Sequence, residues 1–414
     1  MHILLTTPAF PPFPGGGERY AGALARQVAA AGHQVTVVAS TATRESHLWQ
    51  GQTAVPTLDF PPNLNLVHVP LAPFPGGWTG LLAWRKLMVL LSMLPGDHSS
   101  LLQRMARYIP PLPDLAEQLD TLPGPFDLVH AFNISWEYPL LVAWRYARRH
   151  QLPFVATPFM HFGTGHDRVA RNSTMDHQRD LLHDADRVLV LTAVEKEGLL
   201  ALGCRPERVK VVGGGVEEPP PFAETAVVYP PDPYLLFIGR ASHDKGAIHA
   251  AQAVLTLQKQ GDPVTLALIG QTTPQFDRFY HRLTTIEQTV IRPLGILPEA
   301  GKHALLQNSA LLLLPSRTDS FGIVLLEAWH HGKAVIGANA GGLPGVIDDG
   351  QNGLLVPFGD VAALAAAIKR LLTDPALSRQ LGAHGCQKVK QHYTWPQTAR
   401  RILDQYQQLL EKKG

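Results

Sequence analysis

In residues 314–329 a turn that carries an acid is followed by a buried helix, an arrangement that could hold a nucleotide. A leucine-rich strand ends at Pro315, a turn carries Asp319, and a helix with apolar residues almost all round begins at Gly322. Glu327 lies on this helix. A buried carboxylate needs partners, which ribose hydroxyls could supply; the alternative is a core helix with one internally paired acid. The backbone N–H groups expected to meet phosphate belong to Ser320, Phe321, Gly322 and Ile323.

Two cations flank a loop in the second half of the chain. An expected strand over 234–239 ends at Arg240, and Lys245 precedes the helix that follows. Arginine can donate two hydrogen bonds to diphosphate oxygens, and lysine adds a compact positive charge. The pair therefore indicates a diphosphate site, with a solvated loop as the alternative.

Three glycines follow the first expected strand. Gly15, Gly16 and Gly17 precede Glu18 and a helix, so backbone N–H groups there could approach an anion or a reacting centre. The loop is not GxGxxG, and its prolines are foreign to a dinucleotide-binding loop. The alternative is a tight turn between strand and helix.

Two histidines could face a bound substrate: His130 lies at the end of an expected strand, and His161 follows another. A satisfied structural histidine is the alternative in both cases. His161 also begins a histidine-rich run. The run continues with His166, His177 and His183, and it contains no i,i+4 pair. We therefore expect no metal site.

The elements that must position these residues alternate between short β-rich runs and helical patterns, which predicts α/β domains with parallel sheets. The expected strands cover 2–7, 34–39, 65–69, 127–131, 153–157, 187–191, 208–212, 234–239, 264–269, 290–294, 310–314 and 333–337. The expected helices cover 17–31, 138–150, 175–184, 194–202, 246–260, 275–287, 299–308, 322–331, 360–373, 376–391 and a last one from 394. Ligands of doubly wound sheets lie beyond the carboxyl ends of the strands, where the candidate residues fall.

A proline-dense stretch over 217–233 marks a domain boundary. It separates an expected first domain, 1–215, from a second, 216–394. Residues 395–414 carry apolar side chains at helical spacing and need a partner surface.

Composition excludes several classes of protein. The 414 residues are 45% hydrophobic and 17% charged, which argues against disorder, and the net charge of +2 gives no bias toward nucleic acid. Cys204 and Cys386 match no metal or redox spacing, and the first residues resemble a strand rather than a signal peptide. We expect a cytoplasmic protein. Basic and aromatic residues over 78–108 fit an interfacial helix, an acceptor pocket or a core helix, so peripheral membrane contact is one expectation.

Taken together, these segments resemble the retaining glycosyltransferases of family 4. The residues that carry the resemblance are Gly15-Gly16-Gly17-Glu18-Arg19, Gly239-Arg240, Lys245-Gly246, Pro315-Ser316, Asp319-Ser320-Phe321-Gly322, Glu327-Ala328, Gly341-Gly342-Leu343-Pro344 and Gly353-Leu354-Leu355-Val356-Pro357. The resemblance implies the GT-B fold, with two doubly wound Rossmann-like domains facing across a cleft and the C-terminal helix crossing back onto the first domain.

The resemblance also implies transfer of a sugar from a UDP- or GDP-sugar, with retention and without a metal ion or other cofactor. It places the donor in the second domain, where Glu327 would hold ribose and Asp319 the sugar hydroxyls. Gly16, Gly17 and His161 would present the acceptor hydroxyl of a sugar or lipid. The alternatives are a nucleotide-sugar epimerase of the same fold and a non-catalytic sugar- or lipid-binding protein.

Three positions depart from the family pattern. The first acid of the two-acid motif is Asp319 rather than Glu, which leaves the donor sugar open. Phe132 stands where many members have a second histidine after His130, and Gly345 replaces a usual Glu. Residues 184–186 (Asp-Ala-Asp) mimic a metal-binding signature of another glycosyltransferase class, but a polar turn between helix and strand is the preferred interpretation.

Overall fold

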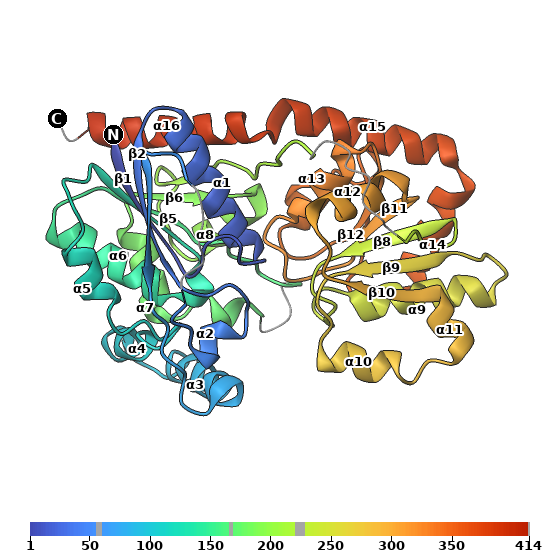
Figure 1. Ribbon diagram of the computed structural model, residues 1–414, viewed down its shortest axis with the longest axis horizontal. Helices are drawn as coiled ribbons and strands as arrows, with labels where there is room; N and C mark the ends of the chain where they lie inside the picture. The colour runs from blue at the N-terminus through green and yellow to red at the C-terminus, as the bar shows by residue number, and fades with distance from the viewer. Residues whose placement is uncertain (55–59, 165–168, 220–227, 413–414) are drawn as a thin grey trace. The chain divides into compact units, whose positions relative to one another are not determined.

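The computed structural model describes residues 1–54, 60–164, 169–219 and 228–412. They form two compact units, each built on its own parallel sheet (Figure 1). Unit 1 comprises Met1–Met160, Arg168–Gly213 and Trp395–Gly414, and unit 2 comprises His161–Asp167 and Gly214–Thr394.

Unit 1 contains a seven-stranded sheet in the order β3-β2-β1-β4-β5-β6-β7, with every pair parallel. Its inner strands are apolar and buried, as expected for strands covered by helices on both faces. The strands are β1 (His2–Thr7), β2 (Gln34–Ser40), β3 (Leu64–Val69), β4 (Leu128–Phe132), β5 (Phe154–Thr157), β6 (Arg187–Val190) and β7 (Val209–Val211).

The helices of unit 1 include three between β3 and β4, of 15, 8 and 6 residues, for which the sequence pattern gave no individual boundaries. The unit contains α1 (Gly16–Ala30), α2 (His47–Gln50), α3 (Gly77–Leu91), α4 (Ser99–Ala106), α5 (Leu115–Asp120), η1 (Ile134–Trp136), α6 (Tyr138–Arg149), η2 (Val169–Asn172), α7 (Asp176–Asp184), α8 (Ala193–Ala201) and α16 (Trp395–Glu411). No helix of the described residues combines the length and the apolar character that crossing a bilayer requires.

Helix α16, the last element of the chain, packs along α1 in unit 1 (Figure 1). The ring of Trp395 lies 5.0 Å from that of Tyr20, and Nε of Arg401 donates to the carbonyl of Val212. Its buried residues recur at helical spacing, so one apolar stripe holds the helix on the unit. They are Trp395, Thr398, Ala399, Ile402, Tyr406 and Leu409.

Unit 2 contains a six-stranded parallel sheet in the order β10-β9-β8-β11-β12-β13, the arrangement of a Rossmann-like domain. Its strands are β8 (Tyr234–Ile238), β9 (Thr265–Ile269), β10 (Ile291–Gly295), β11 (Leu311–Leu314), β12 (Ala334–Ala338) and β13 (Leu354–Val356). Its helices are α9 (Ala247–Lys259), α10 (Pro274–Tyr280), α11 (Thr285–Val290), α12 (Glu299–Asn308), α13 (Ile323–His330), η3 (Leu343–Gly345), α14 (Val361–Thr373) and α15 (Pro375–His392).

Two expectations about unit 2 are wrong. The helix expected over 275–287 is two helices, because Thr284 caps the N–H of Glu287 while the Glu287 carboxylate accepts from the N–H of Thr284, and this capping box starts α11. Only turns were expected between residues 337 and 360, but β13 extends the sheet there by pairing with β12. The expected connection over 217–233 lies partly outside the described residues, at 220–227, as does His166.

Candidate active site

The loops after β8 and β11 carry most of the candidate residues, and these two strands are neighbours at the centre of the unit 2 sheet. The first loop ends at Gly246, which caps α9 with φ of +78°. A Cβ at this position would lie 2.0 Å from the carbonyl oxygen of Pro315 at the end of β11. A glycine is therefore required for the two loops to approach this closely.

Lys245 and Asp319 meet across these loops. Nζ of Lys245 lies 2.7 Å from Oδ1 of Asp319, while Oδ2 of Asp319 is buried and has no hydrogen-bond partner in the structure. Burial would raise the pKa of Asp319, but the charge and hydrogen bond of Lys245, a hydrogen bond from Ser316 and the charge of His161 together lower it. Asp319 is thus an ionised carboxylate with one oxygen available to a ligand hydroxyl.

A pair of glycines supports the turn that carries Asp319. The N–H of Gly342 donates to the carbonyl of Asp319 at 2.7 Å, and a Cβ on Gly342 would lie 1.8 Å from the carbonyl oxygen of Ser320. The N–H of Gly341 donates to the carbonyl of Gly163, which brings the segment after His161 to the same turn. Only a residue without a side chain fits beneath this turn.

Helix α13 begins directly after the turn with an uncapped N-terminus. Gly322 is its N-cap with φ of +80°, and no side chain caps the first N–H groups. The N–H groups at the start of the helix, including that of Ile323, therefore remain suited to an anion. The side chain of Phe321 has a different role from the one expected: its ring is 2% exposed and packs against Tyr393.

Glu327, in the second turn of α13, is 6% exposed and has one paired and one unpaired oxygen. Its Oε1 lies 2.7 Å from Nζ of Lys302 on α12, and its Oε2 has no hydrogen-bond partner in the structure. Lys302 also contacts Oε2 of Glu299 at 2.7 Å. The unpaired Oε2 is the atom that a ligand hydroxyl would satisfy.

Within the described residues, Glu299, His303 and Glu327 form a trio whose ligand atoms lie within 4.8 Å of one another, close enough for a metal ion. The ammonium of Lys302 contacts both carboxylates of this trio. A metal ion there would have to displace a cation already bound, so the trio is better described as a lysine-centred cluster.

Arg240, the other expected diphosphate ligand, is exposed at the end of β8. Its carbonyl accepts from the N–H of Ser242 in the same loop that carries Lys245. On the facing loop Arg317 makes two hydrogen bonds to Oδ1 of Asp244, so the two loops are joined by a second ion pair.

The glycine loop of unit 1 divides into residues with different surroundings. Helix α1 begins at Gly16, and nothing lies within 4 Å of a Cβ placed there. A Cβ on Gly17 would press on the ring of Phe159 at 2.9 Å, so Gly17 is needed for packing. Glu18 is buried, accepts from Nδ2 of Asn133 at 3.1 Å, and has its pKa raised chiefly by burial. Gly16 is therefore the open position of this loop.

His130 lies in the interior of unit 1, which favours a structural role over the expected catalytic one. It is 0% exposed, with Nδ1 2.6 Å from the hydroxyl of Tyr406 and Nε2 2.8 Å from the hydroxyl of Thr157. Burial lowers the pKa of His130 to about 3, so the ring is neutral at ordinary pH. Both nitrogens are engaged between β4, β5 and α16.

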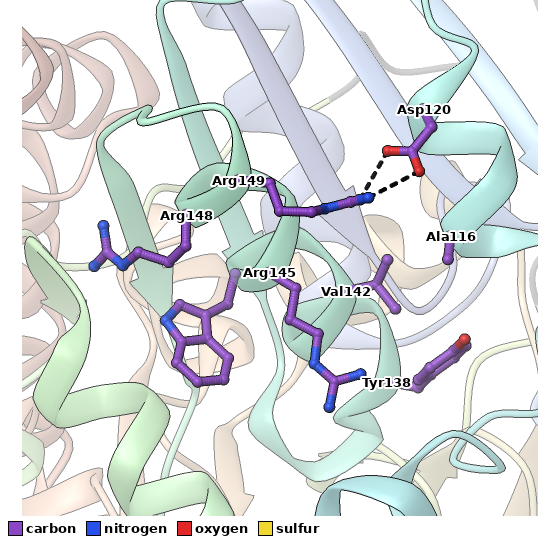
Figure 2. Close-up of a pocket in the computed structure, with 8 residues that line it drawn as sticks. Ala116, Asp120, Tyr138, Val142, Arg145, Arg148 and Arg149 are labelled. Atoms are coloured by element: carbon purple, nitrogen blue, oxygen red, sulfur yellow. Dashed lines mark hydrogen bonds and ion pairs between the residues drawn. The ribbon is translucent and has the colours of Figure 1, made fainter.

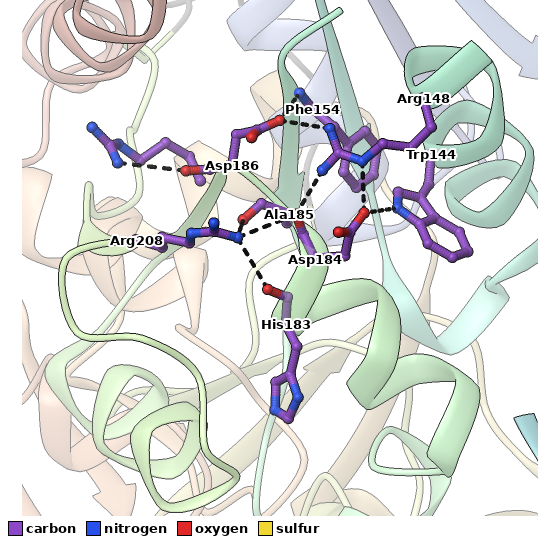
Figure 3. A network of polar contacts seen from close by, with 9 residues as sticks. Trp144, Arg148, Phe154, His183, Asp184, Ala185, Asp186 and Arg208 are labelled. Carbon is purple, nitrogen blue, oxygen red and sulfur yellow. Dashed lines mark hydrogen bonds and ion pairs between the residues drawn. The ribbon is translucent and has the colours of Figure 1, made fainter. Parts of the chain in front are cut away.

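The acid pair at 184–186 is held by protein partners (Figure 3). Asp184 accepts from the indole of Trp144 and from Nε of Arg148, and Asp186 accepts from Nη1 of Arg148 and from the N–H of Phe154. Burial would raise the pKa of Asp184, but these bonds and charges lower it. The turn that joins α7 to β6 therefore has a structural role.

A hollow of about 520 Å³ lies on the outer side of α6 in unit 1 (Figure 2). Two of its arginines are paired with acids: Arg149 contacts both oxygens of Asp120, and Arg148 contacts Asp184 and Asp186. Arg145 hydrogen-bonds to Gln103. None of the expected site residues lines this hollow.

Two family descriptions cover most of the chain. Residues 15–215 match the glycosyl transferase 4-like domain, and residues 224–388 match the glycosyl transferases group 1. The chain belongs to glycosyltransferase family 4.

Named relatives and solved structures agree with this membership. D-inositol 3-phosphate glycosyltransferase 1 of Catenulispora acidiphila is 29% identical over 320 residues, which are 70% of this chain and 74% of the relative. Sucrose-phosphate synthase of Thermosynechococcus elongatus has the same fold, with a TM-score of 0.73, 19% identity and full coverage of both chains. Anabaena HepE, solved with UDP-glucose, has a TM-score of 0.69 and 17% identity over 99% of this chain and 100% of its own. The fold is GT-B, and the chain is a glycosyltransferase.

In this glycosyltransferase, the sequence pattern did not single out two residues that contact a candidate acid or a loop of the site. Lys302 was not singled out, although its i,i+3 spacing from Glu299 was a signal for an ion pair on α12. Ser316 was seen only as part of a motif, yet it is 0% exposed and its Oγ donates to the carbonyl of Asp244 in the loop after β8. Their importance depends on which loops and helices meet, which local patterns do not specify.

Proposed function

We propose that this glycosyltransferase moves a sugar from a UDP- or GDP-sugar to an acceptor hydroxyl with retention and without a metal ion. The observation that carries the proposal is the Lys245–Asp319 ion pair, in which Nζ and Oδ1 are 2.7 Å apart. It connects the two loops that Gly246 allows to approach closely. Asp319 directly precedes the turn into the uncapped N-terminus of α13. The site thus combines a cation, an acceptor for a sugar hydroxyl and N–H donors for phosphate.

The diphosphate is proposed to bind where positive charge gathers. Lys245 and Arg240 lie in the loop after β8, and the partial positive charge of the α13 N-terminus adds to theirs. These groups would stabilise the charge that develops on the departing diphosphate, the task that a metal ion performs in other transferases. HepE was solved with UDP and with UDP-glucose, which supports a nucleotide-sugar donor.

Ribose and the donor sugar are proposed to meet the two acids. The unpaired Oε2 of Glu327 would accept from a ribose hydroxyl, because a buried carboxylate oxygen without a partner is costly. The unpaired Oδ2 of Asp319 would accept from a hydroxyl of the donor sugar in the same way. The shorter side chain of Asp sets how far that hydroxyl must reach.

In the proposed reaction the bond between the anomeric carbon and the diphosphate oxygen breaks, and a bond from the acceptor oxygen to the same carbon forms on the same face. The acceptor proton passes to the departing phosphate oxygen, so charge and atoms balance. We assign no covalent nucleophile to the carboxylates. Burial would raise the pKa of Asp319, and the charge of His161 is among the causes that lower it, which supports a role for His161 beside the donor sugar.

The acceptor is proposed to be a hydroxyl of a glycolipid, a polysaccharide or a small molecule, presented in part by the open position Gly16. The named relatives do not favour the epimerase or the non-catalytic binder, since they are glycosyltransferases and synthases.

The test is to incubate the purified chain with a panel of UDP- and GDP-sugars and simple acceptors, and to follow nucleotide release. Products are then analysed by NMR for the anomeric configuration. Release of nucleoside diphosphate with an α-linked product from an α-linked donor supports the proposal. Inversion, or interconversion of free nucleotide sugars without transfer, contradicts it.

A further inference from the structure

Exposed large apolar side chains are concentrated in one segment of unit 1. Among the described residues, thirteen large hydrophobic side chains are exposed, and eight of them lie between residues 78 and 108. They are Trp78, Leu82, Leu87, Leu90, Met93, Leu94, Leu101 and Tyr108, and we name them the α3–α4 apolar surface. Single exposed apolar residues are common, but a concentration of this kind marks an interaction site.

Helix α3 contributes a continuous stripe to this surface. Trp78, Leu82, Lys86 and Leu90 follow one another at intervals of four residues and so lie on one side of the helix. The three apolar members are 43%, 39% and 59% exposed. The apolar side chains on the solvent side of this helix are in contact with water unless another surface covers them.

The opposite side of α3 is firmly attached to the unit. Met88 is 0% exposed, and the indole of Trp84 donates to the carbonyl of Met105 on α4. Arg85 contacts the buried carboxylate of Glu137 at 2.9 Å and the carbonyl of Asn172 at 2.6 Å. The α3–α4 apolar surface is therefore the outer side of a packed helix.

Positive charge surrounds this surface. Lys86, Arg104, Arg107 and Arg171 are exposed on or beside it, with Nη1 of Arg171 3.2 Å from the sulfur of Met93. Between residues 76 and 112 the sequence has one acid, Asp97.

A second pair of contacts defines the edges of the basic region. Arg145 on α6 donates to Oε1 of Gln103 on α4, so the basic region extends from α4 to α6. At the other end, Asp180 accepts a hydrogen bond from Ser99, which places a second acid at the N-terminal end of α4. The exposed cations outnumber these two acids.

We propose that the α3–α4 apolar surface is an interfacial docking site for a bilayer that contains anionic phospholipids. The apolar stripe would enter the boundary between headgroups and acyl chains, while the surrounding cations contact phosphate groups. A second copy of this chain fits less well, because a symmetric pairing would set the basic rim against itself. The proposal is independent of the sugar donor and of the reaction.

The test is co-sedimentation of the full chain with vesicles of phosphatidylcholine alone and of phosphatidylcholine with phosphatidylglycerol. We expect binding to the anionic vesicles, weakened by salt. In Leu82→Glu/Leu90→Glu the partition constant should fall about tenfold or more, because two apolar side chains are lost. In Lys86→Glu it should fall about fivefold or more, because a charge near the membrane is reversed.

The matched control is Ile286→Glu, which replaces a 73% exposed isoleucine of unit 2 and should leave vesicle binding unchanged. All variants should keep the thermal unfolding midpoint and nucleotide affinity of the wild type, since the substituted side chains are exposed. Absent binding to anionic vesicles, equal binding to both vesicle types, or equal loss in the control overturns the proposal. So does a lipid-free dimer that the Leu82→Glu/Leu90→Glu change dissociates, because the surface would then join two copies.

Discussion

Lys302 and Glu327 form a buried ion pair between α12 and α13, with 2.7 Å between Nζ and Oε1 and side-chain exposures of 6% and 8%. A buried ion pair contributes little net stability compared with apolar residues, yet removing one partner leaves a buried charge that costs about 3–5 kcal/mol. The contact also fixes which oxygen of Glu327 is occupied, so Oε2 remains available. We infer that Lys302 is a positioning residue for Glu327.

Replacing Lys302 by methionine should weaken UDP binding about tenfold or more, because the ribose acceptor loses its orientation. It should also reduce the preference for UDP over its 2′-deoxy and 3′-deoxy analogues, measured as a ratio of Kd values. Lys302→Arg should restore part of that preference. If Lys302→Met binds all three nucleotides with equally reduced affinity, its role is structural only.

The cations of the β8 loop should act on phosphate rather than on the nucleoside. Changing Arg240 or Lys245 to alanine should weaken nucleoside diphosphate binding about tenfold or more while leaving uridine or guanosine binding nearly unchanged, since charge-assisted hydrogen bonds are lost. Titration calorimetry gives both affinities. Lys259→Ala, an exposed lysine at the end of α9, is the matched control. Equal losses for nucleoside and diphosphate would contradict this assignment.

Chelation should leave transfer intact. The trio of Glu299, His303 and Glu327 already contains the ammonium of Lys302, and the acids at 184–186 are engaged by Arg148 and Trp144. We expect the initial rate to be unchanged within about twofold in excess EDTA, because protein cations stabilise the departing diphosphate. Loss of activity in EDTA with recovery on adding Mn²⁺ would show that a metal ion takes part.

The positions of several candidate residues followed from local rules. Asp319 and Lys245 follow strands that alternate with helices, and carboxyl ends of parallel strands meet at one edge of a sheet. The partners of the candidates did not follow from such rules. His130 has the strand-end position expected of a catalytic histidine, but the group that occupies its Nδ1 is Tyr406, 276 residues away. Likewise Phe321 stands in a motif, while the ring it packs against belongs to Tyr393, far along the chain.

Neutral His130 should make unit 1 sensitive to mild acid. Its pKa is lowered to about 3 from 6.5, so the unfolded chain binds a proton that the folded chain excludes. The resulting stability is complete above pH 6.5 and is lost as pH falls toward 3. Between pH 7 and 5 the wild type should lose about 2 kcal/mol more than His130→Gln.

Urea unfolding at the two pH values, followed by tryptophan fluorescence, measures this difference. His281→Gln, which changes an exposed histidine directly after α10, should behave as the wild type. If His130→Gln folds too poorly to compare, Tyr406→Phe offers a second measurement. It removes the hydroxyl 2.6 Å from Nδ1 and should cost about 1–3 kcal/mol without changing kcat for transfer. A tenfold loss of kcat in either variant, if it is fully folded, would show that His130 takes part in catalysis.

Gly342 should be the most sensitive glycine of the donor site, because its neighbours leave no room for a methyl group. A Cβ there would lie 1.8 Å from the carbonyl oxygen of Ser320, so Gly342→Ala must displace the turn that carries Asp319. Misplacing binding groups by about 1 Å can cost on the order of a hundredfold in rate, and we expect that loss in kcat/KM.

The matched control is Gly124→Ala, where the nearest atom is 3.8 Å away. It should keep wild-type activity. Gly342→Ala should still fold, with a stability loss of about 1–3 kcal/mol. Wild-type activity in folded Gly342→Ala would mean that the position of this turn does not matter for transfer.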